Sequence, residues 1–138
     1  MINEKDIKTR LAELLTEDGF RAVSEETEEG FERPAAFISV YPALIALEGP
    51  GMENVTDEIE IAYHPTVRTV EHLSETAQKL RDLLMYKPLA VGDRKLTIQE
   101  IEFEIEDLVL FTRFELSYYQ ETPNVYEEYD EMEELVLG

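Results

Sequence analysis

The chain lacks cysteine, long apolar runs and, relative to its acids, basic side chains. Without cysteine among its 138 residues it has no disulfide, no thiolate metal ligand and no cysteine nucleophile, which fits a reducing compartment. No apolar run reaches the length that a membrane-spanning helix requires. The segment Met1–Asp6 is polar, so we expect no secretory signal there and synthesis in the cytoplasm.

Bases are scarce because 12 lysines and arginines oppose 32 acids, which gives a formal net charge of -20. Such a field repels the phosphates of nucleic acids and of anionic membranes, so we expect neither as a specific partner. The length predicts one domain, in which roughly two-thirds of the unfolded surface is buried. The last nineteen residues, 120–138, hold seven acids and no base.

Apolar residues at helical spacing predict two helices. The first covers residues 4–16, with Asn3 as its N-cap. The second covers residues 70–84, with Thr66 or Thr69 as its N-cap, and ends before a proline.

Segments rich in β-branched and aromatic residues, separated by turn residues, predict the strands. They are a short strand at 20–23, a strand at 34–41 with a continuation at 44–47, a strand at 55–63, a small hairpin of 89–91 and 95–98, and a long hairpin of 98–106 and 109–119 around Asp107-Leu108. Helices on one face of a mostly antiparallel sheet make an α+β domain, residues 1–119, and an acidic C-terminal arm, residues 120–138, follows it.

Two predicted strands carry acids on one side only. Neighbouring acids on one strand face are about 7 Å apart and repel by roughly 0.6 kcal/mol in water, which a fold tolerates. Pairing across the long hairpin places Glu102 opposite Arg113, which offsets part of that charge. Two interpretations stay open, a face turned to water and a face turned to a partner or channel. The acids are Glu100, Glu102, Glu104 and Glu106 on one strand and Glu58 and Glu60 on the other.

Motifs for catalysis or cofactor binding are missing. His64 and His72 are eight residues apart, not at the spacing of a zinc helix, and we expect structural or solvated roles for both. The loop 48–51 lacks the lysine and hydroxyl of a phosphate-binding loop, and Ser39 and Ser117 lie inside strand patterns. We therefore expect no enzyme, no cofactor and no metal site; glutamates on one flat strand face do not converge on a cation.

The acidic C-terminal arm mixes its acids with apolar side chains. Like charges at helical spacing destabilise an isolated helix, so we expect an arm that orders on a partner. The alternative is a solvated acidic tail. The candidate partner-contact residues are Tyr126, Tyr129, Met132 and Leu135.

Several strings, together with the order of the elements, resemble the phage tail terminator family across nearly the whole chain. The strings are Gly30–Ile38, Ile59–Pro65, Ala77–Leu80, Gly92–Leu96, Phe103–Phe111 and Met132–Leu135. Two positions depart from the family pattern: Leu108 stands where glycine is common and Phe111 where histidine is frequent.

The resemblance implies a structural virion protein made in the bacterial host and located in the tail. It implies a ring, usually a hexamer, that caps the head-proximal end of the tail tube and offers a docking surface to the neck. The implied partners are further copies of the chain, the tube protein, and sheath and neck proteins, while DNA passes without specific binding. An acidic face along the channel fits this role. The alternatives are another neck or baseplate adaptor of a phage or tailocin, and an unrelated acidic binding module.

Overall fold

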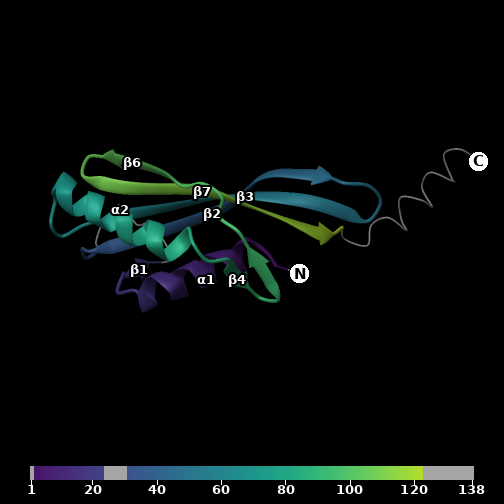
Figure 1. Ribbon diagram of the computed structural model, residues 1–138, viewed down its shortest axis with the longest axis horizontal. Coiled ribbons are helices and arrows are strands. Elements are labelled where there is room, and N and C mark those ends of the chain that lie inside the picture. Colours follow the sequence, from purple (N-terminus) through teal and green to yellow (C-terminus); the bar gives the residue numbers. More distant parts are fainter. Residues whose placement is uncertain (1, 24–30, 123–138) are drawn as a thin grey trace, which may run out of the picture.

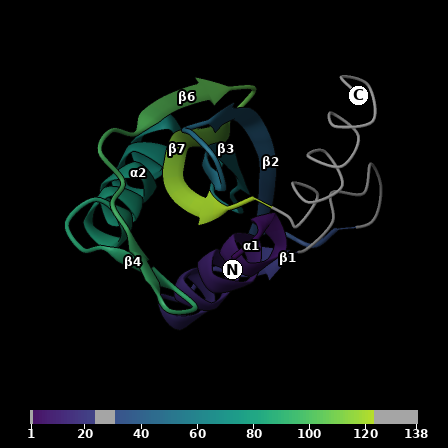
Figure 2. The same ribbon diagram turned by 90° about the vertical axis from the view of Figure 1, so that its right-hand side faces the viewer.

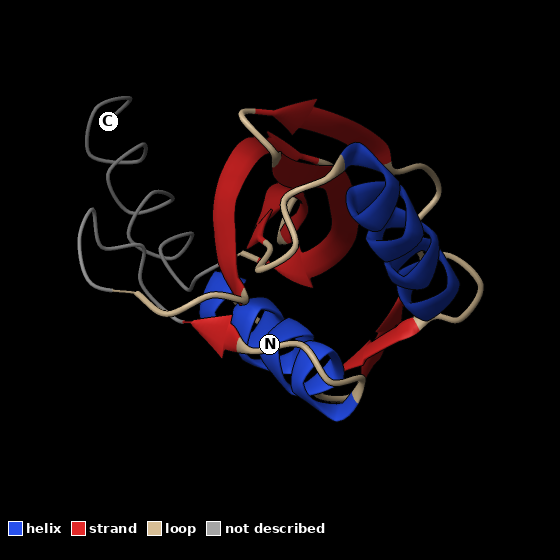
Figure 3. Ribbon diagram, turned by 90° about the vertical axis from the view of Figure 1, so that its left-hand side faces the viewer, coloured by secondary structure: helices blue, strands red, loops and turns tan. Residues whose placement is uncertain are grey.

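The computed structural model describes residues 2–23 and 31–122. These residues form two helices, a five-stranded sheet and a two-stranded sheet (Figure 1, Figure 3). The elements are α1 (Glu4–Glu17), β1 (Ala22–Val23), β2 (Ala35–Leu47), β3 (Met52–His64), α2 (Val70–Leu84), β4 (Leu89–Val91), β5 (Arg94–Leu96), β6 (Glu102–Glu106) and β7 (Val109–Glu121). The predicted α+β class is confirmed.

Three long strands, β2, β3 and β7, form the centre of the large sheet. Its order is β1-β2-β3-β7-β6, and only the short β1 is parallel to its neighbour. Strands β4 and β5 form the small hairpin. Figure 2 shows the curved sheet from its end, with α1 and α2 beside it and β4 between the two helices.

Both helices pack on the same face of the sheet, as predicted. The alternation of β3 and β7 sends every second side chain into this core, where Ile59 and Leu110 are fully buried. The helices contribute their apolar stripes to the same cluster. The fully buried or nearly buried helix residues are Ile7, Leu11, Leu15, Leu73, Leu80 and Leu84.

The helix starts follow from their caps. The Asn3 side chain accepts a hydrogen bond from the backbone N–H of Asp6 at 2.9 Å, and the Asp6 carboxylate accepts one from the N–H of Asn3 at 3.0 Å. Thr69, and not Thr66, caps α2, because its hydroxyl oxygen accepts from the N–H of His72 at 3.1 Å.

The predicted strand 98–106 is wrong at its first half. Strand β6 begins only at Glu102, since Ile98 turns into the core and is 2% exposed. The segment 97–101 therefore leaves the sheet, and β7 loses its neighbour beyond Arg113. The three long strands extend further than predicted: β2 includes the continuation at 44–47, β3 begins at Met52, and β7 ends at Glu121. The short strand β1 covers only Ala22–Val23 of the predicted 20–23, and β5 covers Arg94–Leu96 where 95–98 was predicted.

The turn of the long hairpin is confirmed at Asp107-Leu108. Glu106 pairs with Val109, and the two turn residues have φ angles of 51° and 58°. Positive φ at both positions matches the right-handed twist of the flanking strands, which is why two-residue hairpins adopt it.

Asp57 is a buried acid that the strand alternation places on the core side of β3. Its side chain is fully buried, and its Oδ2 accepts a hydrogen bond from the Tyr118 hydroxyl at 2.9 Å. Burial raises the pKa of Asp57 from 3.8 to about 6, the Tyr118 hydrogen bond opposes the rise, and the nearby Glu4 carboxylate adds to it. The folded protein therefore holds this proton more tightly than the unfolded chain does.

We predict that Asp57→Asn changes the pH dependence of stability. Because the folded pKa is the higher one, the contribution of protonated Asp57 is fully present below about pH 4 and is lost as the pH rises through about 6. The free energy of unfolding of Asp57→Asn should therefore rise relative to the unsubstituted chain between these values and level off above them. Urea unfolding across this range measures the difference, with exposed Asp93→Asn as the matched control. A difference that is constant with pH would contradict the assignment.

Candidate functional site: the acidic sheet face and its groove

The face of the sheet opposite the helices gathers the acidic side chains of three strands. Paired residues of neighbouring strands share a face, and Arg113 of β7 pairs with Glu60 of β3 and with Glu102 of β6. Glu58 and Glu115 form the next pair on this face. We call the acidic sheet face the set Glu58, Glu60, Glu102, Glu104, Arg113 and Glu115.

Arg113 lies at the centre of the acidic sheet face. Its Nε is 2.9 Å from a carboxylate oxygen of Glu60, and its Nη1 is 2.5 Å from one of Glu104. Hydrogen bonds to Glu104 and then to Glu60 raise the pKa of Arg113, and its guanidinium also stacks over the Phe111 ring at 5.2 Å. The single arginine thus ties β3, β6 and β7 together through charge.

The predicted strand register, which places Glu102 opposite Arg113, is correct, but the expected ion pair between these two residues is wrong. Glu102 is opposite Arg113 in the ladder, but among the described residues the arginine forms its ion pairs with Glu60 and Glu104. A long side chain reaches the diagonal neighbour as easily as the direct one, so register alone does not select the partner.

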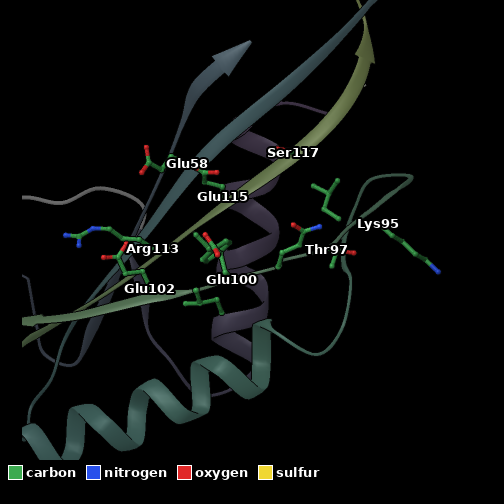
Figure 4. Close-up of a pocket in the computed structure, with 12 residues that line it drawn as sticks. Glu58, Lys95, Thr97, Glu100, Glu102, Arg113, Glu115 and Ser117 are labelled. Carbon is green, nitrogen blue, oxygen red and sulfur yellow. The ribbon is translucent and has the colours of Figure 1, made fainter. Parts of the chain in front are cut away.

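A groove of about 830 Å³ continues the acidic sheet face along the edge of β7. It exists because the segment 97–101 leaves the sheet while β7 continues, so a gap remains between them. Figure 4 shows Glu58, Glu100, Glu102, Arg113 and Glu115 gathered at one part of this groove, with Lys95 at its far side. The groove residues used below are Glu58, Lys95, Glu100, Glu102, Arg113, Glu115 and Ser117.

The structure brings most of the predicted acids together. Four of them, Glu58, Glu60, Glu102 and Glu104, belong to the acidic sheet face. Glu100 precedes β6 and lines the groove, and Glu106 is exposed at the end of β6. The candidate partner-contact residues of the C-terminal arm lie outside the described residues; they are Tyr126, Tyr129, Met132 and Leu135.

The two histidines have structural surroundings. The His64 ring contacts the rings of Phe31 and Phe37, with centroids 4.8 Å and 5.3 Å away. His72 Nε2 is 3.3 Å from the Tyr63 hydroxyl.

Within residues 2–23 and 31–122, no three side chains of the metal-binding types are grouped to hold an ion. No helix in this part of the chain is long and apolar enough to cross a membrane.

One surface feature was not singled out from the sequence. We call residues Ala43–Leu47 the β2 extension. Leu44, Ile45 and Leu47 are 62%, 55% and 68% exposed, although they lie in a regular strand. Figure 1 shows this end of β2, with its neighbours β3 and β7, reaching beyond the helices. The signal in the sequence is the run Tyr41–Leu47, which is uncharged and apolar. Because polar residues do not alternate with apolar ones in it, neither side of this strand is suited to face water.

Comparison with known families identifies the class of protein to which this chain belongs. The family model of phage tail terminator proteins matches residues 5–131, so the chain belongs to the phage tail terminator family. The predicted family is thereby confirmed, and the protein is a structural component of a phage tail.

Two further comparisons add little. A search of curated proteins finds no match. Solved protein chains also match, 14 in number, and one of them has a TM-score of 0.48 and 11% sequence identity, with 89% of this chain and 98% of that chain covered.

We predict that Arg113→Gln lowers the urea midpoint of unfolding and that the loss is larger at low salt. Without the guanidinium, Glu60 and Glu104 repel each other and their glutamate neighbours with nothing between them, and salt screens that repulsion. Urea unfolding at low and moderate ionic strength measures both effects. The control is Arg81→Gln, because Arg81 is exposed on α2 and forms no ion pair with a described residue. Equal losses in the two variants would contradict the central role of Arg113.

Proposed function

We propose that the chain assembles into a hexameric ring on the head-proximal end of the tail tube, where it stops tube growth and provides the docking surface for the neck. The observation that carries this proposal is the family match over residues 5–131, which covers every helix and strand except the first residue of α1. The tube protein is the primary partner, and sheath and neck proteins are the further ones. The domain of residues 1–119 supplies the ring body, and the C-terminal arm, residues 120–138, supplies an added contact.

In this ring the acidic sheet face lines or borders the channel. Its glutamates are exposed or half-buried, and they lie on paired strands. Because they are on the sheet face opposite the helices, one subunit can turn this face to the channel and its helices away from it. Carboxylates along the channel repel DNA phosphates, so DNA passes without being held. Six copies carry a formal charge of -120, and we therefore expect ring closure to strengthen with salt.

We predict that the protein limits the growth of cognate tail tubes. Tube protein polymerised alone should give long tubes of uncontrolled length, and addition of this chain should shorten them and place one ring on one end. Electron microscopy measures tube length and the occupied end. Occupation of the baseplate-proximal end would favour a baseplate adaptor, and no binding to either end would favour an unrelated acidic binding module; both outcomes contradict the cap.

We predict that charge reversal of glutamates on the channel side lowers DNA passage through the rings that still assemble. The variant is Glu58→Lys, Glu100→Lys, Glu102→Lys and Glu106→Lys together, which spares the two glutamates bound to Arg113. Lysines in the channel should hold DNA phosphates and lower DNA delivery by assembled particles.

The matched control places four lysines on the exposed helix surface, at Glu17, Glu71, Glu75 and Asp82, so the net charge changes equally. Delivery by the channel variant equal to that of this control would show that the four substituted glutamates do not line the channel.

We predict that the apolar residues of the C-terminal arm contribute to ring or tube contact. Truncation after Thr122 should weaken oligomer formation or tube binding, measured by sedimentation with tubes. Serine at Tyr126, Tyr129, Met132 and Leu135 in the full chain should reproduce the loss, while neutralising the acids of the arm should not. If truncation changes neither property, the arm is a solvated acidic tail.

A further inference from the structure

The long strands leave two open edges in the described part of the chain. Strand β2 pairs with β1 only at Ala36 and Phe37, so its outer edge is unpartnered from Ile38 to Leu47. Strand β7 pairs with β6 only from Val109 to Arg113. Beyond this point a single side-chain hydrogen bond, from the Arg94 guanidinium to the carbonyl oxygen of Tyr119, reaches the β7 edge. Open edges of this kind are templates for strand addition.

The β2 extension, residues Ala43–Leu47, lacks the charged side chains that protect an edge strand from pairing. Leu44 and Ile45 are neighbours in a strand and so point to opposite faces, yet both are more than half exposed. The segment carries no charge, and the irregularity at Pro42/Leu44 lies at its start, leaving the rest of the strand regular. Exposed apolar strands without charges or bulges are binding or aggregation surfaces in natural proteins.

The charge of the groove along β7 disfavours an acidic strand and admits an uncharged one. Four of its carboxylates, on Glu58, Glu100, Glu102 and Glu115, face two basic groups, on Lys95 and Arg113, so an acidic segment entering it is repelled. Residues 123–138 of this chain carry six acids and no base, which disfavours the C-terminal arm as the occupant. The β2 extension is uncharged, extended and apolar, and its open edge is the complement of the β7 edge.

We propose that the β2 extension of one copy adds as a strand to the open β7 edge of a neighbouring copy, within the groove. Strand β3 lies between β2 and β7 in one copy, so the contact joins two copies and uses a different surface on each. Repetition of such a contact generates a ring when the rotation closes. The inference rests on the proposed ring and names its subunit interface.

Cysteine cross-linking tests this interface directly, because the chain contains no cysteine of its own. Leu44 and Ser117 both pair with Thr56, on opposite sides of it, so in one copy they are two strand spacings apart, about 10 Å. A disulfide cannot bridge that distance, and a bond between cysteines at these sites must join two copies. Because a closed ring links many copies, oxidation of Leu44→Cys with Ser117→Cys should give a ladder of covalent oligomers on a non-reducing gel.

The register of the added strand is covered by placing the first cysteine in turn at Ala43, Leu44, Ile45 and Ala46. The control pair is Val67→Cys with Ser117→Cys, since Val67 is 54% exposed but lies before α2. A ladder from at least one position of the β2 extension and none from the control supports the proposal. Wild-type rings without a ladder from any of the four positions would overturn this interface and leave the ring itself intact.

A second pair of variants tests the charge argument. Leu44→Glu with Leu47→Glu brings two carboxylates to the acidic groove and should raise the concentration needed for oligomer formation by at least about tenfold. Val67→Glu with Val70→Glu changes two valines that are 54% and 56% exposed elsewhere, and should have little effect. Equal effects of the two variants would contradict the interface. A wild-type chain that stays monomeric with and without tubes would overturn the ring and this interface together.

Discussion

Burial of one face of β3 and β7 against the helices along most of their length is the constraint on which the structure depends. Both helices cover the same face of β2, β3 and β7, and the buried alternation of β3 and β7 fixes which side chains meet them. A slip of one residue would send Ile59 and Leu110 to the outside and bring glutamates into the core, so the register is strongly determined. Apart from a small apolar cluster around Ala35, Phe37 and Ala62, the other sheet face is thereby free for charge.

The acidic side chains of the outer sheet face are organised around one arginine, Arg113. Arg113 connects β3 and β6 through Glu60 and Glu104, while no other arginine or lysine of the described residues forms an ion pair with the remaining glutamates of that face. The result is a rigid surface that stays negative. At the far end of the same strands, the β2 extension is uncharged and apolar. One subunit thus presents an acidic sheet face and an apolar exposed strand, the two surfaces on which the proposed ring rests.

The sequence predicted the fold well because its signals are local. Period-two alternation, the Asn3 cap and the Asp107-Leu108 turn each specify their own element, and all three agree with the structure. The predictions that were wrong depend on tertiary contacts between elements that are far apart in the sequence. Ile98 leaves the sheet because its side chain is buried in the core. Arg113 forms an ion pair with Glu104, which is diagonal to it on the neighbouring strand, and not with Glu102, which is directly opposite. The exposure of the β2 extension depends on where the helices end, which no pattern within the strand reveals.

The mass of the protein in solution, by light scattering at low and moderate salt, with and without cognate tail tubes, tests the central claim most directly. The proposed ring requires a hexamer that salt favours, or a monomer that becomes a ring only on tube ends, because six highly acidic copies must be brought together. A protein that stays monomeric and does not bind tubes under any of these conditions would contradict the proposed ring.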